Sequence, residues 1–218
     1  KTLTVTDVAG NTSTCSATIT VTDNSPPVVV CQDITIQLDA SGNAIIVGSD
    51  IDGGSTDNGT IVSAIAGQTA FDCNHIGANT VTLTVTDDGG NISTCDATVT
   101  VEDSIDPVAI CQDITIQLDA SGNATILAAD IDNGSTDNCG IATLDVAQAN
   151  FDCADLGVNT VTLTVTDQSG NTTTCSSTVT VNDIEAPVIT CPSDITVNND
   201  LGICGAIVSY ASPIGTDN

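Results

Sequence analysis

The chain repeats itself with an unbroken period of 80 residues. The segment CQDITIQLDASGNA at 31–44 returns unchanged at 111–124, and NTVTLTVTD at 79–87 returns at 159–167. A fixed period with nearly identical sequence is typical of tandem copies of one structural unit. Any fold or function assigned to the chain must therefore suit an array of similar modules.

The period divides the 218 residues into complete and partial repeats. We expect one complete repeat at 24–103 and a second at 104–183. Residues 1–23 are expected to be the C-terminal part of a preceding repeat, and 184–218 the N-terminal part of a following one. The sequence is thus expected to be a section of a longer repetitive protein.

The charge of the chain is strongly one-sided. It has 28 Asp and Glu residues against a single basic residue, Lys1, which gives a net charge of -27. Such a surface repels polyanions, so we exclude nucleic acid and anionic lipid as partners. No apolar run approaches the roughly 20 residues of a membrane helix, so direct membrane insertion is not expected either.

Apolar and polar residues alternate as they do in half-buried strands. In VTLTVTD, Val161, Leu163 and Val165 alternate with threonines, a two-residue period with β-branched side chains. Strands are expected near Pro107–Ile110, Ile114–Leu118, Ala124–Leu127, Ile141–Val146, Asn159–Thr166 and Thr172–Val181. The prediction is an all-β chain of immunoglobulin-like β-sandwich modules of about 80 residues, arranged end to end as a rod. A solenoid fits less well, because its repeats run about 20–50 residues.

The ten cysteines stand at repeated positions, which favours an oxidising, extracellular setting. Cys111 lies about eight residues inside one end of its repeat and Cys175 about eight residues inside the other, so at ~3.3 Å per residue both reach mid-height. We therefore predict the disulfides Cys31–Cys95 and Cys111–Cys175. The rival pair Cys95–Cys111 would need a folded-back junction to bring its Cα atoms within about 7 Å.

The other cysteines follow the repeat less regularly. Cys139–Cys153 is predicted as a second disulfide of its repeat. The copy of Cys139 one period earlier is Gly59, so Cys73 is free, joined to another molecule, or a sign of a sequence error at position 59. The cysteines expected to be unpaired, or paired outside the fragment, are Cys15, Cys73, Cys191 and Cys204.

Acidic loops in each repeat offer oxygen ligands of the kind that Ca²⁺ prefers. Two loops have the D-x-D-x-G pattern, and further acids gather where one repeat meets the next. The candidate calcium ligands are Asp50, Asp52, Asp57, Asp130, Asp132, Asp137, Glu102, Asp103 and Asp106. A solvated acidic turn, or a surface adapted to salt water, explains the same residues without a bound ion.

Nothing in the sequence marks a catalytic site. His75 is the only histidine, and there is neither a nucleophile elbow nor a metal-binding histidine cluster. We predict no enzyme activity and name no catalytic residue.

Several motifs resemble hyalin (HYR) repeats and HYR-like modules. They are PVITCPSDITV at 187–197, LGICGA at 201–206, and the endings of the two complete repeats at 90–103 and 170–183. The sequences CQDITIQLDASGNA and STDNCGI also resemble those of the long repeat arrays in surface adhesins of Bacteroidota. The resemblance implies an immunoglobulin-like fold, a cell-surface location (secreted or anchored in the outer membrane), and commonly export by the type IX secretion system.

Two classes of function remain after these considerations. The first is a structural or adhesive stalk or filament segment of a large bacterial surface adhesin, linked to attachment or gliding. Its partners would be neighbouring repeats and other copies in a filament. The second is a module that binds a glycan or a protein on the cell surface. Such a ligand face should lie where the two repeats differ most, at 63–74 versus 143–154 and at Asp88–Gly89 versus Gln168–Ser169.

Overall fold

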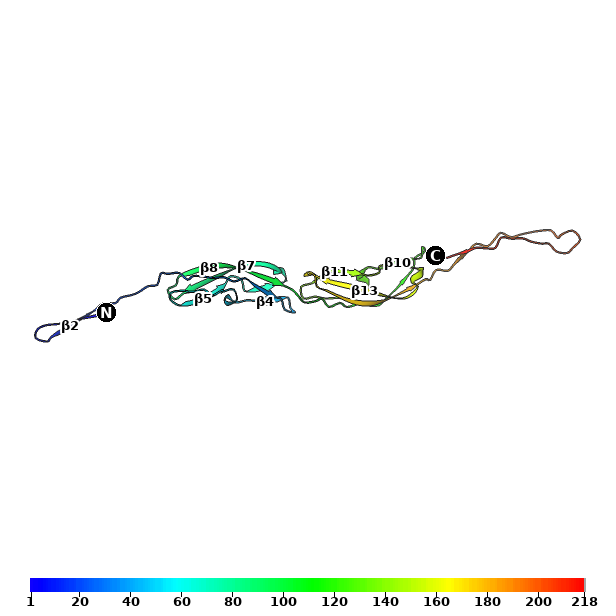
Figure 1. Ribbon diagram of the computed structural model, residues 1–218. Helices are drawn as coiled ribbons and strands as arrows, with labels where there is room; N and C mark the ends of the chain where they lie inside the picture. Colours follow the sequence, from blue (N-terminus) through cyan, green and yellow to red (C-terminus); the bar gives the residue numbers. More distant parts are fainter. Residues whose placement is uncertain (218) are drawn as a thin grey trace. The chain divides into compact units, whose positions relative to one another are not determined.

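The computed structural model describes residues 1–217, which fall into two compact units, Lys1–Ser104 and Ile105–Asn218. The regular secondary structure of both units is almost entirely β-strand (Figure 1). Within residues 1–217, no helix has the length and apolar character needed to cross a membrane.

The second unit contains one complete β-sandwich. Its elements are β9 (Ile114–Gln117), β10 (Asn123–Thr125), α1 (Ala128–Ile131), β11 (Ile141–Val146), β12 (Asn150–Asp152), the 3-10 turn η3 (Cys153–Asp155), β13 (Gly157–Asp167) and β14 (Thr172–Asn182). One layer is the four-stranded sheet β11-β13-β14-β9, in which β9 runs parallel to β14 and the other pairs are antiparallel. The other layer holds the pair β10-β12 and the isolated bridges Val108↔Thr136 and Cys111↔Asp132.

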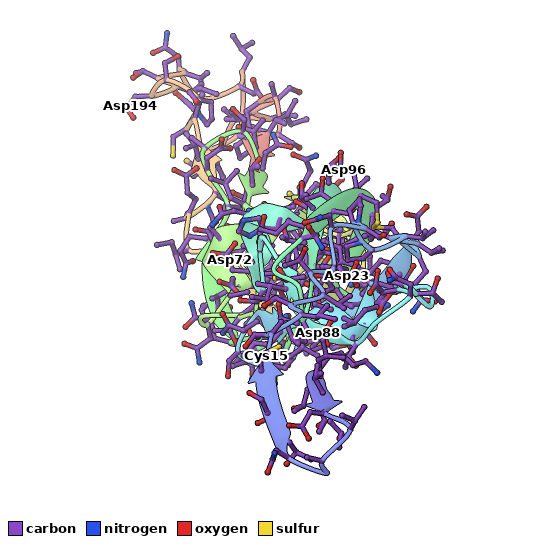
Figure 2. All side chains as sticks on the ribbon, turned by 90° about the vertical axis from the view of Figure 1, so that its left-hand side faces the viewer. Cys15, Asp23, Asp72, Asp88, Asp96 and Asp194 are labelled. Carbon is purple, nitrogen blue, oxygen red and sulfur yellow. A yellow bond between two sulfur atoms is a disulfide. The ribbon has the colours of Figure 1, made fainter. Side chains whose placement is uncertain are left out.

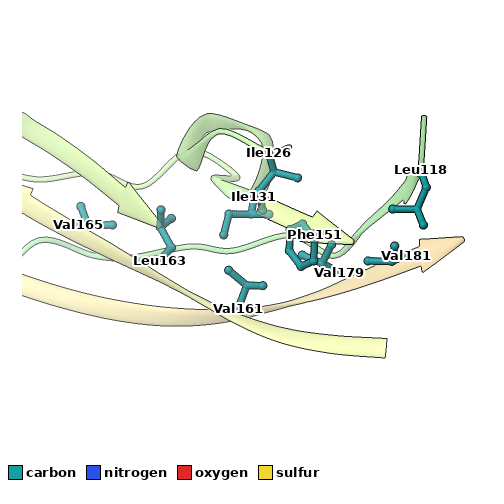
Figure 3. Close-up of a cluster of buried hydrophobic side chains, with 9 residues drawn as sticks. All are labelled: Leu118, Ile126, Ile131, Phe151, Val161, Leu163, Val165, Val179 and Val181. Carbon is teal, nitrogen blue, oxygen red and sulfur yellow. The ribbon is translucent and has the colours of Figure 1, made fainter. Parts of the chain in front are cut away.

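The predicted alternation decides which side chains enter the core. Val161, Leu163 and Val165 are at most 1% exposed, whereas the threonines between them are only partly buried. From the opposite layer, Ile126, α1 residue Ile131 and β12 residue Phe151 pack against this row, as the close-up in Figure 3 shows. The members of the cluster are Leu118, Ile126, Ile131, Phe151, Val161, Leu163, Val165, Val179 and Val181.

The first unit contains a sandwich with the same order of elements. They are β3 (Ile34–Gln37), β4 (Asn43–Ile45), the 3-10 turn η1 (Gly48–Asp50), β5 (Ile61–Ala66), β6 (Ala70–Asp72), the 3-10 turn η2 (Cys73–His75), β7 (Gly77–Asp87) and β8 (Ile92–Glu102). The sheet order β3-β8-β7-β5 and the pair β4-β6 match the second sandwich strand for strand. The all-β class and the tandem immunoglobulin-like modules are therefore properties of the structure.

Near each end of the chain, a pair of short antiparallel strands lies outside these sandwiches. In the first unit, β1 (Thr2–Thr6) pairs with β2 (Thr12–Ser16), and every residue of the hairpin is exposed. In the second unit, β15 (Val188–Ile189) pairs with β16 (Gly215–Thr216), also with exposed residues. Within residues 1–217, neither pair of strands has a second layer to pack against.

The strand expected near Pro107–Ile110 is reduced to a single bridge at Val108. Proline has no N–H to donate to a ladder. The backbone N–H of Ile110 donates to the Ser135 hydroxyl oxygen instead, at 3.0 Å. The short strand β12 was not among the expected strands.

Two disulfides join the layers of the sandwiches. Cys31–Cys95 and Cys111–Cys175 are present, with Cα–Cα distances of 5.9 and 5.8 Å. Cys31 and Cys111 belong to bridges of the smaller layer, whereas Cys95 and Cys175 lie on β8 and β14 of the large sheet.

The predicted Cys139–Cys153 bond is wrong, because Cys153 is a thiol. Ile141, two residues after Cys139, pairs with Asp167 at the end of β13, whereas Cys153 lies in η3 just before β13 begins at Gly157. The ten steps along β13 amount to about 33 Å, far beyond the ~7 Å that a disulfide allows between Cα atoms. The two cysteines stand at opposite ends of one sandwich.

Cys73 also differs from expectation, because it takes part in a disulfide, as does Cys139. It was expected to be unpaired or paired outside the fragment. Cys15, Cys191 and Cys204 are exposed thiols in the structure, and their pairing outside the fragment stays a prediction.

Candidate functional site

Three aspartates gather at one end of the first sandwich. Asp23 precedes the first complete repeat, Asp57 lies in the loop before β5, and Asp88 directly follows β7. Each can offer one oxygen such that the oxygens all lie within 4.8 Å of one another. Figure 2 shows Asp23 and Asp88 among the labelled side chains of this end. Antiparallel pairing of β5 with β7 explains the meeting, because it sets the start of β5 beside the end of β7.

Amide groups of the loop before β5 hold the three carboxylates. Asn58 Nδ2 donates to Asp23 Oδ2 at 3.1 Å, and the Gly59 N–H donates to Asp57 Oδ2 at 2.7 Å. The Thr60 N–H donates to Asp88 Oδ1 at 3.4 Å. These three donors are neutral, and Lys1 is the only lysine or arginine in the sequence. The negative charges are therefore not offset by a basic side chain of the loop.

Gly59 leaves the space in front of these carboxylates open. A Cβ atom at position 59 would lie 2.8 Å from Asp88 Oδ1 and 3.2 Å from oxygens of Asp23 and Asp57. All three aspartates thus converge on the position that a larger residue would occupy. This geometry fits a small cation with oxygen ligands.

A buried turn fixes the segment that carries Asp23. Asp87, at the end of β7, is 1% exposed, and its carboxylate accepts hydrogen bonds from Asn91 N at 2.7 Å and Asn91 Nδ2 at 2.8 Å. Asn91 Nδ2 also donates to the backbone oxygens of Asp23 and Ser25, at 3.2 and 3.3 Å. Burial raises the pKa of Asp87, but the hydrogen bonds from Asn91 and the turn glycines outweigh it and leave the pKa below its ordinary value.

A second acidic group has counterparts of two of these positions one period later. Asp103, Asp137 and Asp167 also offer oxygens within 4.8 Å of one another. Asp103 is 7% and Asp167 1% exposed, so this group is more buried than the first. Asp137 Oδ2 accepts from the Cys139 N–H at 2.8 Å, and Asp137 Oδ1 is buried without a hydrogen-bond partner among the described residues. Asp167 is the counterpart of Asp87, whereas the counterpart of Asp88 is Gln168.

The D-x-D-x-G loops use their aspartates within the loop. Asp50 Oδ2 accepts from Val47 N, and Asp130 Oδ2 from Leu127 N, each at 2.7 Å. Asp52 and Asp132 accept hydrogen bonds from the serine three residues on, and the serine hydroxyl is the largest of the causes that lower the pKa of each. In the described part of the chain, none of these four joins a group of three candidate metal ligands.

Of the other five predicted calcium ligands, three belong to the acidic groups and two do not. Asp57 and Asp137 belong to the two acidic groups, as does Asp103. Glu102 Oε2 accepts from Gln37 Nε2 at 2.7 Å, and neither Glu102 nor Asp106 joins a group within residues 1–217.

The candidate calcium ligands predicted from the sequence did not include Asp23, Asp88 or Asp167. The signal was the acidic turn that follows each LTVTD segment. Because β7 and β13 end at that turn, their last residues must lie beside the loop that starts the strand paired with them.

No protein-family model matches the chain, and no curated protein matches it. Among solved structures, it is similar to the protocadherin gamma B4 extracellular domain, with 16% identity and a TM-score of 0.36 over 77% of this chain and 34% of that one. Human protocadherin-24 EC1-2 is similar at 12% identity and a TM-score of 0.40, over 73% of this chain and all of that one. Drosophila N-cadherin EC1-4 is similar at 13% identity and a TM-score of 0.40, over 72% and 50%.

This chain thus spans about a third of the protocadherin gamma B4 structure. Its class follows from its own strand order: tandem immunoglobulin-like sandwiches, each with a disulfide between its layers.

Proposed function

We propose that the chain is a structural and adhesive segment of a large extracellular protein, in which repeated sandwiches carry other parts of the protein away from a surface. The sequence resemblance to HYR-like repeats supports a bacterial cell-surface adhesin of the Bacteroidota, exported by type IX secretion, as that parent protein. The disulfides support an oxidising compartment.

One observation carries this proposal. Nine buried hydrophobic positions carry the same residue in both complete repeats, one period apart: Leu38 and Leu118, Ile46 and Ile126, Ile51 and Ile131, Phe71 and Phe151, Val81 and Val161, Leu83 and Leu163, Val85 and Val165, Val99 and Val179, Val101 and Val181. The buried Ala66 and Ala97 are replaced one period later by Val146 and Ser177. A spacer requires this uniformity of fold, because each copy has to contribute the same geometry and the same stability.

The alternative of a glycan-binding module gains no support from the aromatic residues of the two sandwiches. Sugars commonly stack on exposed aromatic rings, but Phe71 and Phe151 are only 2% exposed and belong to the core. The segments with the largest sequence differences, 63–74 and 143–154, each contain one of these buried rings.

A repeat exchange in the parent protein separates the two functions. Deleting residues 104–183 in frame keeps the period, and we expect surface display to persist while attachment of cells under flow weakens. Replacing 104–183 by a second copy of 24–103 should restore attachment, because a spacer depends on length and fold. A failure of this replacement, with display intact, would instead assign a specific ligand to 104–183.

We further propose Ca²⁺ as the ligand of the group formed by Asp23, Asp57 and Asp88. The support is the convergence of three carboxylates at an open position, with no basic side chain in the surrounding loop. Like charges at such separations repel by about 1–4 kcal/mol per pair, depending on solvent exposure, and a divalent cation relieves this repulsion. Each sandwich has its own apolar core and disulfide, so we expect it to stay folded without the ion.

The test compares calcium with sodium chloride of matched ionic strength. We expect millimolar calcium to raise the thermal midpoint of the chain further than sodium chloride does. Asp57→Asn should abolish that difference. Asp96→Asn, which removes the same charge from the exposed face of β8, should keep it. Equal midpoints in the two salts would leave the aspartates as a solvated surface.

A further inference from the structure

The chain contains two Asn-Gly dipeptides, Asn58-Gly59 and Asn133-Gly134, and all four residues are exposed. Asparagine is among the chemically labile residues of proteins. It is most labile before glycine, because a residue without Cβ lets its backbone nitrogen approach the preceding side chain. Both dipeptides follow an aspartate and precede a hydroxyl residue, so their intrinsic reactivity is similar and the fold decides which of them reacts.

The fold restrains the first dipeptide at both reacting groups. Asn58 Nδ2 donates to Asp23 Oδ2 at 3.1 Å, and the Gly59 N–H donates to Asp57 Oδ2 at 2.7 Å. Before the nitrogen of Gly59 can attack the side-chain amide, its own hydrogen bond has to break and the amide has to turn. We expect both hydrogen bonds to slow the reaction at this position.

The second dipeptide is held less firmly. The Gly134 N–H donates to Asp132 Oδ2 at 3.3 Å, which is longer than the usual range of such bonds. Within residues 1–217, the side-chain amide of Asn133 makes no hydrogen bond. The amide can therefore turn toward the nitrogen of Gly134 at little cost.

We propose that Asn133 is a site of spontaneous deamidation, whereas the fold protects Asn58. The backbone nitrogen of Gly134 bonds to Asn133 Cγ, the bond between Cγ and Nδ2 breaks, and the proton of the attacking nitrogen leaves with ammonia. Water then adds across one of the two ring C–N bonds of the succinimide at these carbonyl groups. Depending on which bond opens, residue 133 becomes aspartate or isoaspartate, and no oxidant or reductant takes part.

The isoaspartate product does not fit the loop in which it forms. Ile110 holds the loop at two points, because its backbone oxygen accepts from Asn133 N at 2.8 Å and its N–H donates to Ser135 Oγ at 3.0 Å. Isoaspartate routes the main chain through Cβ, which adds a methylene between residues 133 and 134. The longer chain cannot keep both bonds unless the loop or Ile110 moves. Since Cys111 follows Ile110, the smaller layer is weakened beside its disulfide to β14.

The first repeat has the same loop without the reactive amide. Gly53 stands one period before Asn133. The Gly53 N–H donates to the backbone oxygen of Val30 at 2.7 Å, and the Val30 N–H donates to Ser55 Oγ at 3.1 Å, as in the second repeat. We therefore expect ageing to weaken the second sandwich and to spare the first.

Incubation of the folded, oxidised chain in ¹⁸O-labelled water at mildly alkaline pH tests the proposal. Deamidation places ¹⁸O in the new carboxylate, so peptides cut with pepsin in acid show which asparagine has reacted. We expect label to appear at Asn133 several times faster than at Asn58. In the reduced and denatured chain the two rates should become similar, because the hydrogen bonds that protect Asn58 are lost.

The variant Asn133→Gly is the matched control, because it restores the loop sequence of the first repeat. It should fold, take up no label at that position and keep its stability during ageing. Hydrogen exchange at core amides should become faster only in the second sandwich of the aged parent chain, and in neither sandwich of the aged variant. Absence of label at Asn133, equal labelling of Asn58 and Asn133 in the folded chain, or equal changes in the parent and the variant would overturn the proposal.

Discussion

Asp132 Oδ1 accepts hydrogen bonds from both the backbone N and the hydroxyl of Ser135, and Asp52 does the same with Ser55. The serine hydroxyl is the largest cause that lowers the pKa of each carboxyl group. A group whose pKa is lower in the folded state stabilises that state when ionised. Its contribution is complete above the unfolded pKa of about 3.9 and is lost as the pH falls through the folded pKa.

The variant Asp52→Asn/Asp132→Asn should therefore be less stable than the parent chain at pH 7, and its stability should fall less steeply as the pH drops below about 4. Urea unfolding at several pH values measures both effects. Asp145→Asn, a change at an exposed aspartate of β11, serves as the control and should leave the acid limb unchanged. Parallel acid limbs for the parent and the double variant would contradict the prediction.

The disulfide Cys111–Cys175 closes a loop with a sequence separation of 64 residues. Replacing both cysteines by alanine should lower the free energy of unfolding of the second sandwich by about 2–5 kcal/mol, because the unfolded chain regains the freedom that the bond removes. Equilibrium denaturation followed by hydrogen exchange at core amides measures this loss. The first sandwich, which keeps Cys31–Cys95, is the internal control. Equal losses in both sandwiches would argue against a local effect of the bond.

The in-repeat disulfides were predictable because their partners sit on strands of known length in a two-layer fold. The position of Cys139 relative to Cys153 was not predictable, because it depends on which strands pair and in which register. Only the register of Ile141 with Asp167 shows that Cys139 and Cys153 occupy opposite ends. The same register, absent from the sequence, brings Asp57 and Asp88 together.

At the scale of strands, the sequence LTVTD occurs three times, and the burial of its side chains differs between the copies. In β7 and β13 its leucines, Leu83 and Leu163, are 0% exposed, whereas Leu3 in β1 is 62% exposed. All three segments pair with a following antiparallel strand. Strand pairing is thus encoded locally, but burial requires the second layer, which β1 and β2 lack.

Because Leu163 and Leu3 occupy the same place in identical LTVTD sequences, Leu3 is a matched control for a mutation of the buried Leu163. Leu163→Ala should lower the free energy of unfolding by about 2–5 kcal/mol, because it removes a buried side chain and leaves a cavity. Leu3→Ala should change it by about 0.5 kcal/mol or less, as expected for an exposed position. Chemical denaturation of both variants measures the difference. A comparable loss in Leu3→Ala would show that β1 packs against a layer after all.

Alternation identified the long strands well, since every second residue is buried along the second half of β7, β8, β13 and β14. It could not identify β12, because a three-residue strand contains too little pattern. Phe151, the buried side chain of β12, is visible in the sequence only as one of three aromatic residues. Its neighbours Asn150 and Asp152 point to a turn rather than to a strand.

At the scale of the whole chain, a net charge of -27 spread over 218 residues repels itself in the compact state. Raising sodium chloride from about 0.01 M to 1 M shortens the Debye length from about 30 Å to about 3 Å. We therefore expect the thermal unfolding midpoint to rise over this range, by several degrees if screening contributes about 1 kcal/mol. Calorimetry across the salt series measures it. A midpoint that is constant or falls with salt would mean that this repulsion is not a substantial cost to the fold.

The disulfides within the sandwiches also determine how the array responds to pulling. A pulling force applied along the chain is transmitted from Cys31 to Cys95 through their disulfide. The segment between them, with a sequence separation of 64, therefore carries no force even after the sandwich has unfolded. Between Cys95 and Cys111 only 16 positions remain to be stretched in each period of 80. At ~3.5 Å per residue this amounts to about 55 Å, against about 280 Å for an unbridged repeat. An array of such repeats would therefore reach its maximum length after a short extension, and the force would rise steeply from there.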